Sequence, residues 1–216
     1  MELKNIYRGN EVKFAAMFRA LQPALLADFI SAHPDFQAGE KFTGVPYYQS
    51  PNGNNSALYN EVNAWKMSGI KHDKFGLLSM FRSRYPTAFA LVEAFGDECQ
   101  MAGYSIVEPN AIIYRHTGVE NRDAKSIRIH IPLYVPEGDI GFEVEGEIVL
   151  WDDVFSFNNQ KLHSVWNNTS ERRLVLLLDL SREICDLPPA PAWTPGCNDN
   201  VPGFEKTRDP NYTPVN

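Results

Sequence analysis

Cysteine is scarce in this chain. Cys99, Cys185 and Cys197 are the three cysteines among 216 residues, and they are widely spaced. An odd, scattered set indicates neither a disulfide framework nor a Cys-x-x-Cys metal site. Long apolar runs are also missing, because no stretch approaches the ~18 apolar residues of a membrane span and the start, Met1 to Asn5, lacks the apolar core of a signal peptide. We expect a soluble protein of the reduced cytoplasm.

Positive charge is in deficit. The chain has 27 acidic and 20 basic residues and a net charge of −7. This balance argues against nucleic acid or an anionic membrane as the main partner. The hydrophobic fraction of 44% and the charged fraction of 22% are ordinary for a globular protein. At this length one domain can build a full core, so we expect a single domain over residues 1–216.

The residue pattern of the first 102 residues indicates helices and loops. Apolar residues at helical spacing predict a helix over 11–31, with Pro23 expected to bend or split it. A second helical region is predicted over 74–98, with Pro86 starting a new helix. Between them, residues 35–60 are polar and rich in Gly, Asn and Tyr. That segment is interpreted either as a loop over a pocket or as a surface loop packed by its own aromatic residues.

From Tyr104 onward the texture changes to short β-branched and aromatic runs separated by turn residues. Eight strands are predicted, over 103–108, 111–116, 126–135, 140–144, 147–151, 154–158, 161–167 and 172–180. So many short strands after helices favour a mainly β fold, a double-stranded β-helix or cupin-like jelly roll with a helical layer on one sheet. The jelly-roll core is assigned to 103–180, and 181–216 is a proline-rich tail to which no structure is assigned.

Alternation predicts two different faces in the strand over 126–135. Ile127, Ile129 and Ile131 share one face with Leu133 and Val135, while Arg128, His130 and Tyr134 share the other. The aliphatic face belongs to the core. The Arg/His face is left either for solvent or for a polar cavity inside the barrel.

Arg173 is the charged residue whose surroundings are most unusual. In the strand over 172–180 it shares a face with Val175, Leu177 and Asp179. A guanidinium among apolar neighbours needs an anionic partner. An acidic ligand, an internal salt bridge and a strand end that reaches solvent remain open as explanations.

Two histidines end or occupy strands. His116 closes an apolar run, and His163 lies within a strand-like segment. They are 47 residues apart, so spacing alone defines no metal motif, and isolated histidines of this kind are most often structural. His33 and His72 lie in loop-like contexts and are interpreted as structural.

Taken together, motifs between residues 103 and 180 form a recognisable series. They are Ser105 in a strand before Pro109, His116-Thr117-Gly118 eleven residues after that Ser, Arg128-Ile129-His130, Asp152-Asp153-Val154-Phe155, His163-Ser164-Val165-Trp166, and Arg173-Leu174 ten residues past the second histidine. This series resembles the aspartyl/asparaginyl β-hydroxylase family of Fe(II)- and 2-oxoglutarate-dependent oxygenases. The Arg-x-His motif is also similar to that of bacterial proline cis-4-hydroxylases.

The resemblance implies a set of roles. His116 and His163 would be the iron ligands. Arg173 would take the distal carboxylate of 2-oxoglutarate, a task suited to the fixed fork of a guanidinium. Three further residues would help to hold 2-oxoglutarate, namely Ser105, Arg128 and His130, and Val107 would line its site. Asp153 would hold an iron-bound water. The cofactors would be Fe(II), the cosubstrate 2-oxoglutarate, and O₂.

The sequence departs from the family in ways that keep alternatives open. More residues than usual separate Asp153 from His163, and the stretch between His116 and His130 is longer. Gly118 stands where the commonest related enzymes carry a carboxylate ligand. The β-hydroxylases share this glycine, and halogenases also have a small residue at this position. Glu120 or Asp123 is a weaker alternative as a third ligand. The expected activity is therefore hydroxylation of an amino acid or amino-acid residue, with a halogenase or a non-catalytic cupin-like binding protein as alternatives. Four arginines could anchor a substrate carboxylate or be surface charges: Arg82, Arg84, Arg115 and Arg122.

Overall fold

The computed structural model describes residues 3–36, 64–72, 76–117 and 124–191. Several features singled out in the sequence lie outside the described residues: most of the polar loop over 35–60, the tail beyond residue 191, Gly118, Glu120, Arg122, Asp123 and Cys197.

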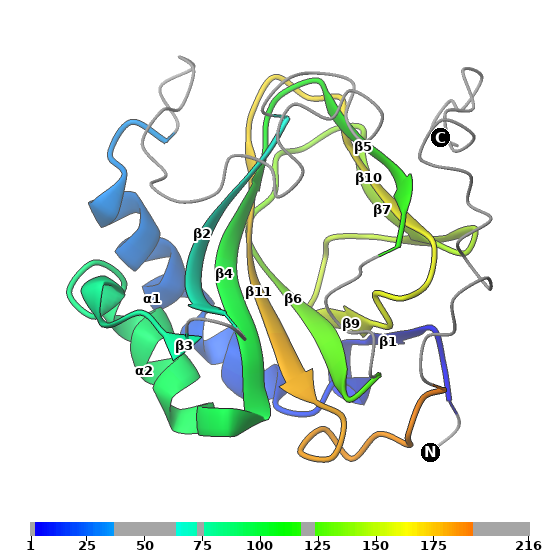
Figure 1. Cartoon of the computed structure of the whole chain (residues 1–216). Helices are drawn as coiled ribbons and strands as arrows, with labels where there is room; N and C mark the ends of the chain where they lie inside the picture. Colours follow the sequence, from blue (N-terminus) through cyan, green and yellow to red (C-terminus); the bar gives the residue numbers. More distant parts are fainter. Residues whose placement is uncertain (1–2, 37–63, 73–75, 118–123, 192–216) are drawn as a thin grey trace.

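Two antiparallel sheets form the body of the protein (Figure 1). The larger has the strand order β1-β9-β6-β11-β4-β2-β3 and the smaller β5-β10-β7-β8. The strands are β1 (Ile6–Arg8), β2 (Trp65–His72), β3 (Gly76–Leu77), β4 (Cys99–Val107), β5 (Ala111–His116), β6 (Ser126–Tyr134), β7 (Ile140–Val144), β8 (Glu147–Val149), β9 (Phe155–Phe157), β10 (His163–Asn167) and β11 (Arg173–Ser181).

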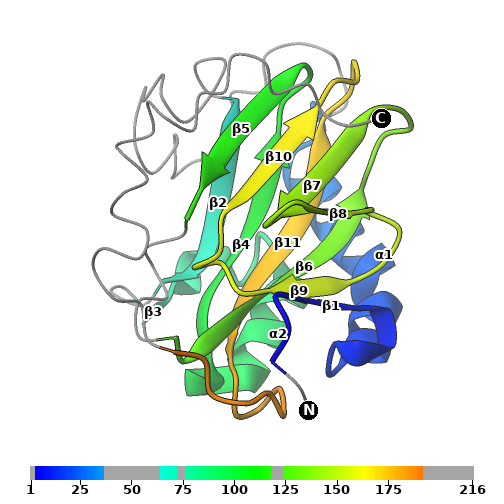
Figure 2. The same ribbon diagram turned by 90° about the vertical axis from the view of Figure 1, so that its right-hand side faces the viewer.

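The smaller sheet lies across the inner face of the larger one (Figure 2). Side chains from both sheets, including Val107, Phe142, Val165 and Val175, form a shared interior cluster. The neighbours β9-β6-β11-β4 in the larger sheet are not consecutive along the chain, because the chain crosses to the smaller sheet between them to form β5, β7, β8 and β10. Two facing antiparallel sheets connected in this way define a jelly roll. The predicted fold class is confirmed, and all eight strands predicted after residue 102 are present.

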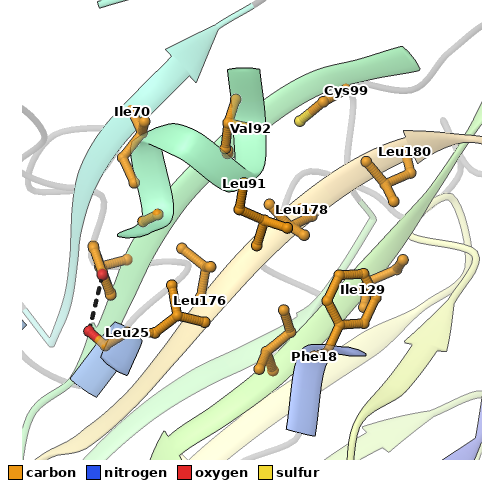
Figure 3. Packing of buried hydrophobic residues seen from close by; sticks show 14 of the residues in the cluster. Phe18, Leu25, Ile70, Leu91, Val92, Cys99, Ile129, Leu176, Leu178 and Leu180 are labelled. Carbon is orange, nitrogen blue, oxygen red and sulfur yellow. Dashed lines mark hydrogen bonds between the residues drawn. The ribbon is translucent and has the colours of Figure 1, made fainter. Parts of the chain in front are cut away.

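Two helices cover the outer face of the larger sheet (Figure 1). They are α1 (Ala15–Ala32) and α2 (Pro86–Phe95). Phe18 and Leu25 of α1 pack against aliphatic side chains of the central strands (Figure 3), and Phe29 belongs to the same cluster. α1 contains Pro23 and continues through it, so the helix does not split there. Neither helix is long and apolar enough to cross a membrane, within the residues that the structure describes.

The second helical region is shorter than predicted. Pro86 is the first residue of α2, as expected. The first N–H groups of a helix have no hydrogen-bond partner within it, and proline carries no N–H. Asp28 of α1 accepts a hydrogen bond from the backbone N–H of Thr87 at 2.6 Å and so caps this helix. The residues before Pro86 do not form the predicted helix: Gly76–Leu77 pairs with β2, and Ser79–Phe81 is a single 3₁₀ turn.

Alternation along β6 holds until a bulge near its end. Ile127, Ile129 and Ile131 belong to the helix-covered core, as predicted. Between the pairs Val175–Pro132 and Leu174–Tyr134 the register shifts by one residue. The extra residue changes the face of the following side chain. Tyr134 therefore packs with the helix-covered core rather than on the face of Arg128 and His130, and this part of the prediction is wrong.

Candidate active site

A pocket opens between the two sheets, and both sheets contribute to its wall. The larger sheet supplies Trp65, Ser105, Arg128, His130, Phe157, Arg173 and Leu177, and the smaller supplies Ile113, His116, Phe142, His163 and Val165. The family resemblance gives roles to eight residues, and six of them line this one cavity. Along the chain they lie up to 68 residues apart. Their roles remain predictions.

The two histidines face each other across neighbouring strands. His116 and His163 are Cα partners in the β5–β10 ladder, and their ring centroids are 4.2 Å apart. Val165 pairs with Ile113, so β5 contains one extra residue between the two pairs. That bulge puts His116 on the same side as Ile113, three residues earlier, where plain alternation would have turned it away.

Hydrogen bonds fix the tautomer of both rings. Nδ1 of His116 bonds the carbonyl oxygen of Tyr114 at 2.8 Å, and Nδ1 of His163 bonds that of Lys161 at 2.7 Å. A carbonyl oxygen only accepts, so each Nδ1 carries the proton and Nε2 of the neutral ring is the unprotonated nitrogen. Burial and then His116 lower the pKa of His163 well below its usual value. Neutral, oriented imidazoles of this kind fit a divalent metal ion.

Iron(II) in proteins commonly takes two histidines and a carboxylate. Among the described residues no cluster of three or more His, Cys, Asp or Glu side chains could hold a metal ion. His116 and His163 face each other in the pocket, and Gly118, Glu120 and Asp123, the positions considered for a third ligand, lie outside the described residues.

Arg173 is buried without a carboxylate partner among the described residues. It is 1% exposed, and its Nη2 donates to the hydroxyl of Ser105 at 3.1 Å. Its Nε and Nη1 are buried and make no hydrogen bond. Burial lowers its pKa to about 9. Unsatisfied donors on a buried cation are costly, so this side chain has the properties of a site for an anionic ligand. The internal salt bridge considered from the sequence is not present within the described chain.

Arg128 is in the opposite situation. Its guanidinium donates from Nε and Nη2 to both carboxylate oxygens of Asp179, at 2.8 and 2.7 Å. Both side chains are buried. Arg128 lines the pocket, but its charge is already balanced by a permanent partner.

His130 lies in an aromatic surround. Phe142, Trp151, Phe155 and Phe157 have ring centroids between 4.8 and 5.6 Å from its own. Burial, and then Arg173 and Arg128, lower its pKa well below the usual value. Its Nδ1 is buried without a hydrogen bond, so the neutral ring retains one polar atom for a ligand.

Two predicted site residues are not in the pocket wall. Val107 is buried in the interior cluster beside the pocket, paired in register with Arg173. Asp153 lies elsewhere: both of its carboxylate oxygens accept hydrogen bonds from Arg19 of α1, at 2.8 and 2.6 Å. Hydrogen bonding from Arg19 lowers the pKa of Asp153. The residues that separate Asp153 from His163 form strand β9 and a turn, which moves Asp153 to the far end of that strand.

Sequence reasoning missed Trp65 and Trp151. Trp65 begins β2, a strand that no prediction covered, and its indole N–H donates to Ser105 at 2.8 Å. Trp151 stacks on Arg173. Of the arginines considered as substrate anchors, Arg115 pairs with buried Glu143 and Arg82 with Glu93 on α2. The guanidinium carbon of Arg84 lies 5.9 Å from the ring centroid of Tyr85.

Two facing antiparallel sheets with a pocket between them give this protein the architecture of the cupin-like jelly rolls. The aspartyl/asparaginyl β-hydroxylase family model matches residues 30–183, more than half of the chain. The chain belongs to this family. The match confirms the resemblance that the sequence motifs carry.

Similar proteins agree with this assignment. The chain is 29% identical to an aspartyl/asparaginyl β-hydroxylase of Mus musculus over 101 residues, which is 44% of this chain and 13% of that protein. It is 29% identical to the Homo sapiens protein of the same name over 79 residues, 36% of this chain and 10% of that protein. The matched region therefore spans about a tenth of the length of these relatives.

Solved structures that resemble this chain include an oxygenase family member and a prolyl hydroxylase. A 2OG-Fe(II) oxygenase family oxidoreductase from Burkholderia pseudomallei has a TM-score of 0.41 at 13% identity, covering 55% of this chain and 68% of that one. A prolyl hydroxylase from Trichoplax adhaerens, solved with a peptide fragment, has a TM-score of 0.42 at 12% identity, covering 82% and 83%.

Proposed function

We propose that this protein is an Fe(II)- and 2-oxoglutarate-dependent dioxygenase that hydroxylates an unactivated C–H bond of an amino acid or amino-acid residue, with release of succinate and CO₂. One observation carries the proposal. Two histidines whose Nδ1 atoms are held by backbone carbonyls share a pocket with a buried guanidinium whose Nε and Nη1 make no hydrogen bond to the described residues. A metal ion chelated by a dicarboxylate would satisfy both halves of the pocket.

Each pocket residue has a task in this proposal. His116 and His163 would hold iron through their Nε2 atoms, and the backbone carbonyls of Tyr114 and Lys161 keep the rings oriented. Arg173 and Ser105 bind the distal carboxylate of 2-oxoglutarate, while Trp65 orients the Ser105 hydroxyl. Arg128 and His130 bind the remainder of the cosubstrate. The oxidation of the C–H bond is the chemistry that Fe(II), 2-oxoglutarate and O₂ supply when bound.

The protein also excludes water from the site. Phe142, Phe157, Val165 and Leu177 give the pocket apolar walls. A low-dielectric wall strengthens the attraction between Arg173 and a carboxylate and limits side reactions with solvent.

The test is an anaerobic titration of the protein with Fe(II) and 2-oxoglutarate, followed by the weak visible charge-transfer absorbance of the chelate. We expect the band in the wild type and in His72→Ala, because His72 of β2 does not line the pocket. His163→Ala and Arg173→Ala should lose it. Wild-type turnover of 2-oxoglutarate by His163→Ala would refute the iron-ligand assignment.

Product analysis separates the alternatives. With an amino-acid panel as substrate, hydroxylation adds one oxygen atom to the product mass, while a halogenase would give a chloride-dependent product with chlorine in place of hydrogen. A protein that retains no metal and shows no band would be a non-catalytic cupin-like binding protein.

A further inference from the structure

The ring of Trp151 contacts the guanidinium of Arg173. Trp151 lies in the connection between β8 and β9 and is 7% exposed. The guanidinium carbon of Arg173 is 4.5 Å from the centroid of its ring. The electron-rich face of an indole attracts a cation, and more strongly when water is excluded.

The indole is itself held by neighbouring rings. The imidazole of His130 stacks on it, with centroids 5.6 Å apart and planes inclined by 13°. Phe142 and Phe155 meet it edge-on, at 5.6 and 5.3 Å. A ring fixed on several sides can fix in turn the plane of the guanidinium that it contacts.

Arg128 and Arg173 show two ways to keep a cation in this pocket. Arg128 is balanced by the carboxylate of Asp179, which occupies its Nε and Nη2. Arg173 has an aromatic face in place of a carboxylate, and its Nε and Nη1 make no hydrogen bond. A carboxylate partner would compete with an incoming carboxylate for the same donors. An indole face stabilises the charge and occupies none of them.

We propose that Trp151 is a positioning residue for Arg173: its indole face stabilises the buried guanidinium and fixes its plane, so that Nε and Nη1 remain available to the distal carboxylate of a dicarboxylate ligand. The inference rests on the proposed function, because it takes 2-oxoglutarate as that ligand. The indole N–H of Trp151 is also buried without a hydrogen bond, so the same cluster holds one more unsatisfied donor.

The experiment measures equilibrium binding by calorimetry, with Mn(II) in place of Fe(II) and without O₂. The ligands are 2-oxoglutarate and pyruvate, a 2-oxo acid that lacks the distal carboxylate. Trp151→Leu should weaken 2-oxoglutarate binding by about threefold to thirtyfold, the range of a cation–π contact at a partly to fully desolvated site. Pyruvate binding should not change. Trp151→Phe should fall between wild type and Trp151→Leu.

Two controls test whether Trp151 acts through Arg173. In an Arg173→Met background, Trp151→Leu should have no further effect on 2-oxoglutarate binding. Trp166→Phe, on β10, should bind as the wild type does, because Trp166 donates to Asp139 and does not line the pocket.

Each contrary result has a distinct meaning. A folded Trp151→Leu protein with wild-type 2-oxoglutarate affinity, or with equal losses for both ligands, overturns the inference and leaves the proposed function standing. If Trp151→Leu does not fold, the ratio of the two affinities in Trp151→Phe decides in the same way. A wild type that binds pyruvate and 2-oxoglutarate equally well, or binds neither, overturns the proposed function and the inference with it.

Discussion

The two faces of the larger sheet differ in how their polar groups are treated, although the same strands build both. On the outer face, Leu174, Leu176, Leu178 and Leu180 of β11 pack against the helices, and the side chains of His33, Tyr85 and Ser68 form a buried hydrogen-bonded group. On the inner face, Arg173 and His130 retain buried polar atoms without hydrogen bonds among the described residues. A satisfied polar group contributes to stability, and an unsatisfied one beside a pocket is prepared for a ligand.

The contrast is sharpest within β11. Leu176 and Arg173 are both fully buried, and they lie three residues apart on opposite faces. Substitutions at the two positions should therefore separate stability from binding.

Arg173→Met should have the largest effect on binding. Loss of the guanidinium should weaken 2-oxoglutarate binding by about 2–5 kcal/mol, the usual result of removing one partner of a buried charged contact. The free energy of unfolding should stay the same or rise, because an apolar side chain replaces an unpaired buried charge. Calorimetry and urea unfolding measure the two quantities. Substantial destabilisation would show that Arg173 has a structural role.

Leu176→Ala should have the reverse profile. Truncating a fully buried leucine in the helix-covered core (Figure 3) leaves a cavity and should lower the free energy of unfolding by about 2–5 kcal/mol. The folded fraction should still bind 2-oxoglutarate as the wild type does. Leu177→Ala is the matched variant, because Leu177 lines the pocket on the opposite face. It should lose less stability and bind more weakly; equal behaviour of the two variants would contradict the division between the faces.

His33 on the outer side should make stability depend on pH. Burial, and then Arg84, lower the pKa of His33 to about 4, so the folded protein keeps it neutral over a range where the unfolded chain protonates it. The unfolded state therefore binds more protons as the pH falls from about 6.5 towards 4, and the free energy of unfolding falls with it. Between pH 7 and pH 5 this amounts to at most about 2 kcal/mol.

The contribution of His33 is measured by comparison with His33→Gln. The pKa values of His130 and His163 are also lowered. These two histidines therefore also reduce the free energy of unfolding as the pH falls, in wild type and in His33→Gln alike. The stability difference between wild type and variant should shrink as the pH falls from 7 to 5. A difference that is constant over this range would mean that His33 does not titrate as described.

The sequence contains the alternation that separates these faces. The period-2 pattern in 126–135 assigned Ile129 to the core and Arg128 and His130 to the other face, and the pattern in 172–180 placed Arg173 on one face with Val175 and Leu177. They could not reveal the bulges. The extra residue in β5 turns His116 towards His163, and the one near Leu133 turns Tyr134 away from the pocket.

Long-range partners were also beyond sequence reasoning. Asp153 was given a role beside the iron because of its place in a motif, but Arg19, 134 residues away, holds its carboxylate. Trp151 reads as one more apolar residue before a turn, and its contact with Arg173 exists only once β9 and β11 are folded. β2 was missed because it is interrupted by Gly69 and polar residues, and it is defined by pairing with β4.

Tyr85→Phe tests the hydrogen-bonded group of His33, Tyr85 and Ser68 directly. The Tyr85 hydroxyl is 2.6 Å from Nε2 of His33 and 3.0 Å from the hydroxyl of Ser68, both buried. Its removal deletes two hydrogen bonds without emptying the core, so we expect a loss of about 1–3 kcal/mol in the free energy of unfolding.

Tyr104→Phe is the matched variant for this prediction. The Tyr104 hydroxyl donates a single hydrogen bond, to the carbonyl oxygen of Leu25 at 3.0 Å. Its loss should be smaller than that of Tyr85→Phe, and neither variant should change 2-oxoglutarate affinity. If Tyr85→Phe weakened binding while leaving stability intact, the buried polar groups under the helices would belong to the site, and the two faces would not be independent.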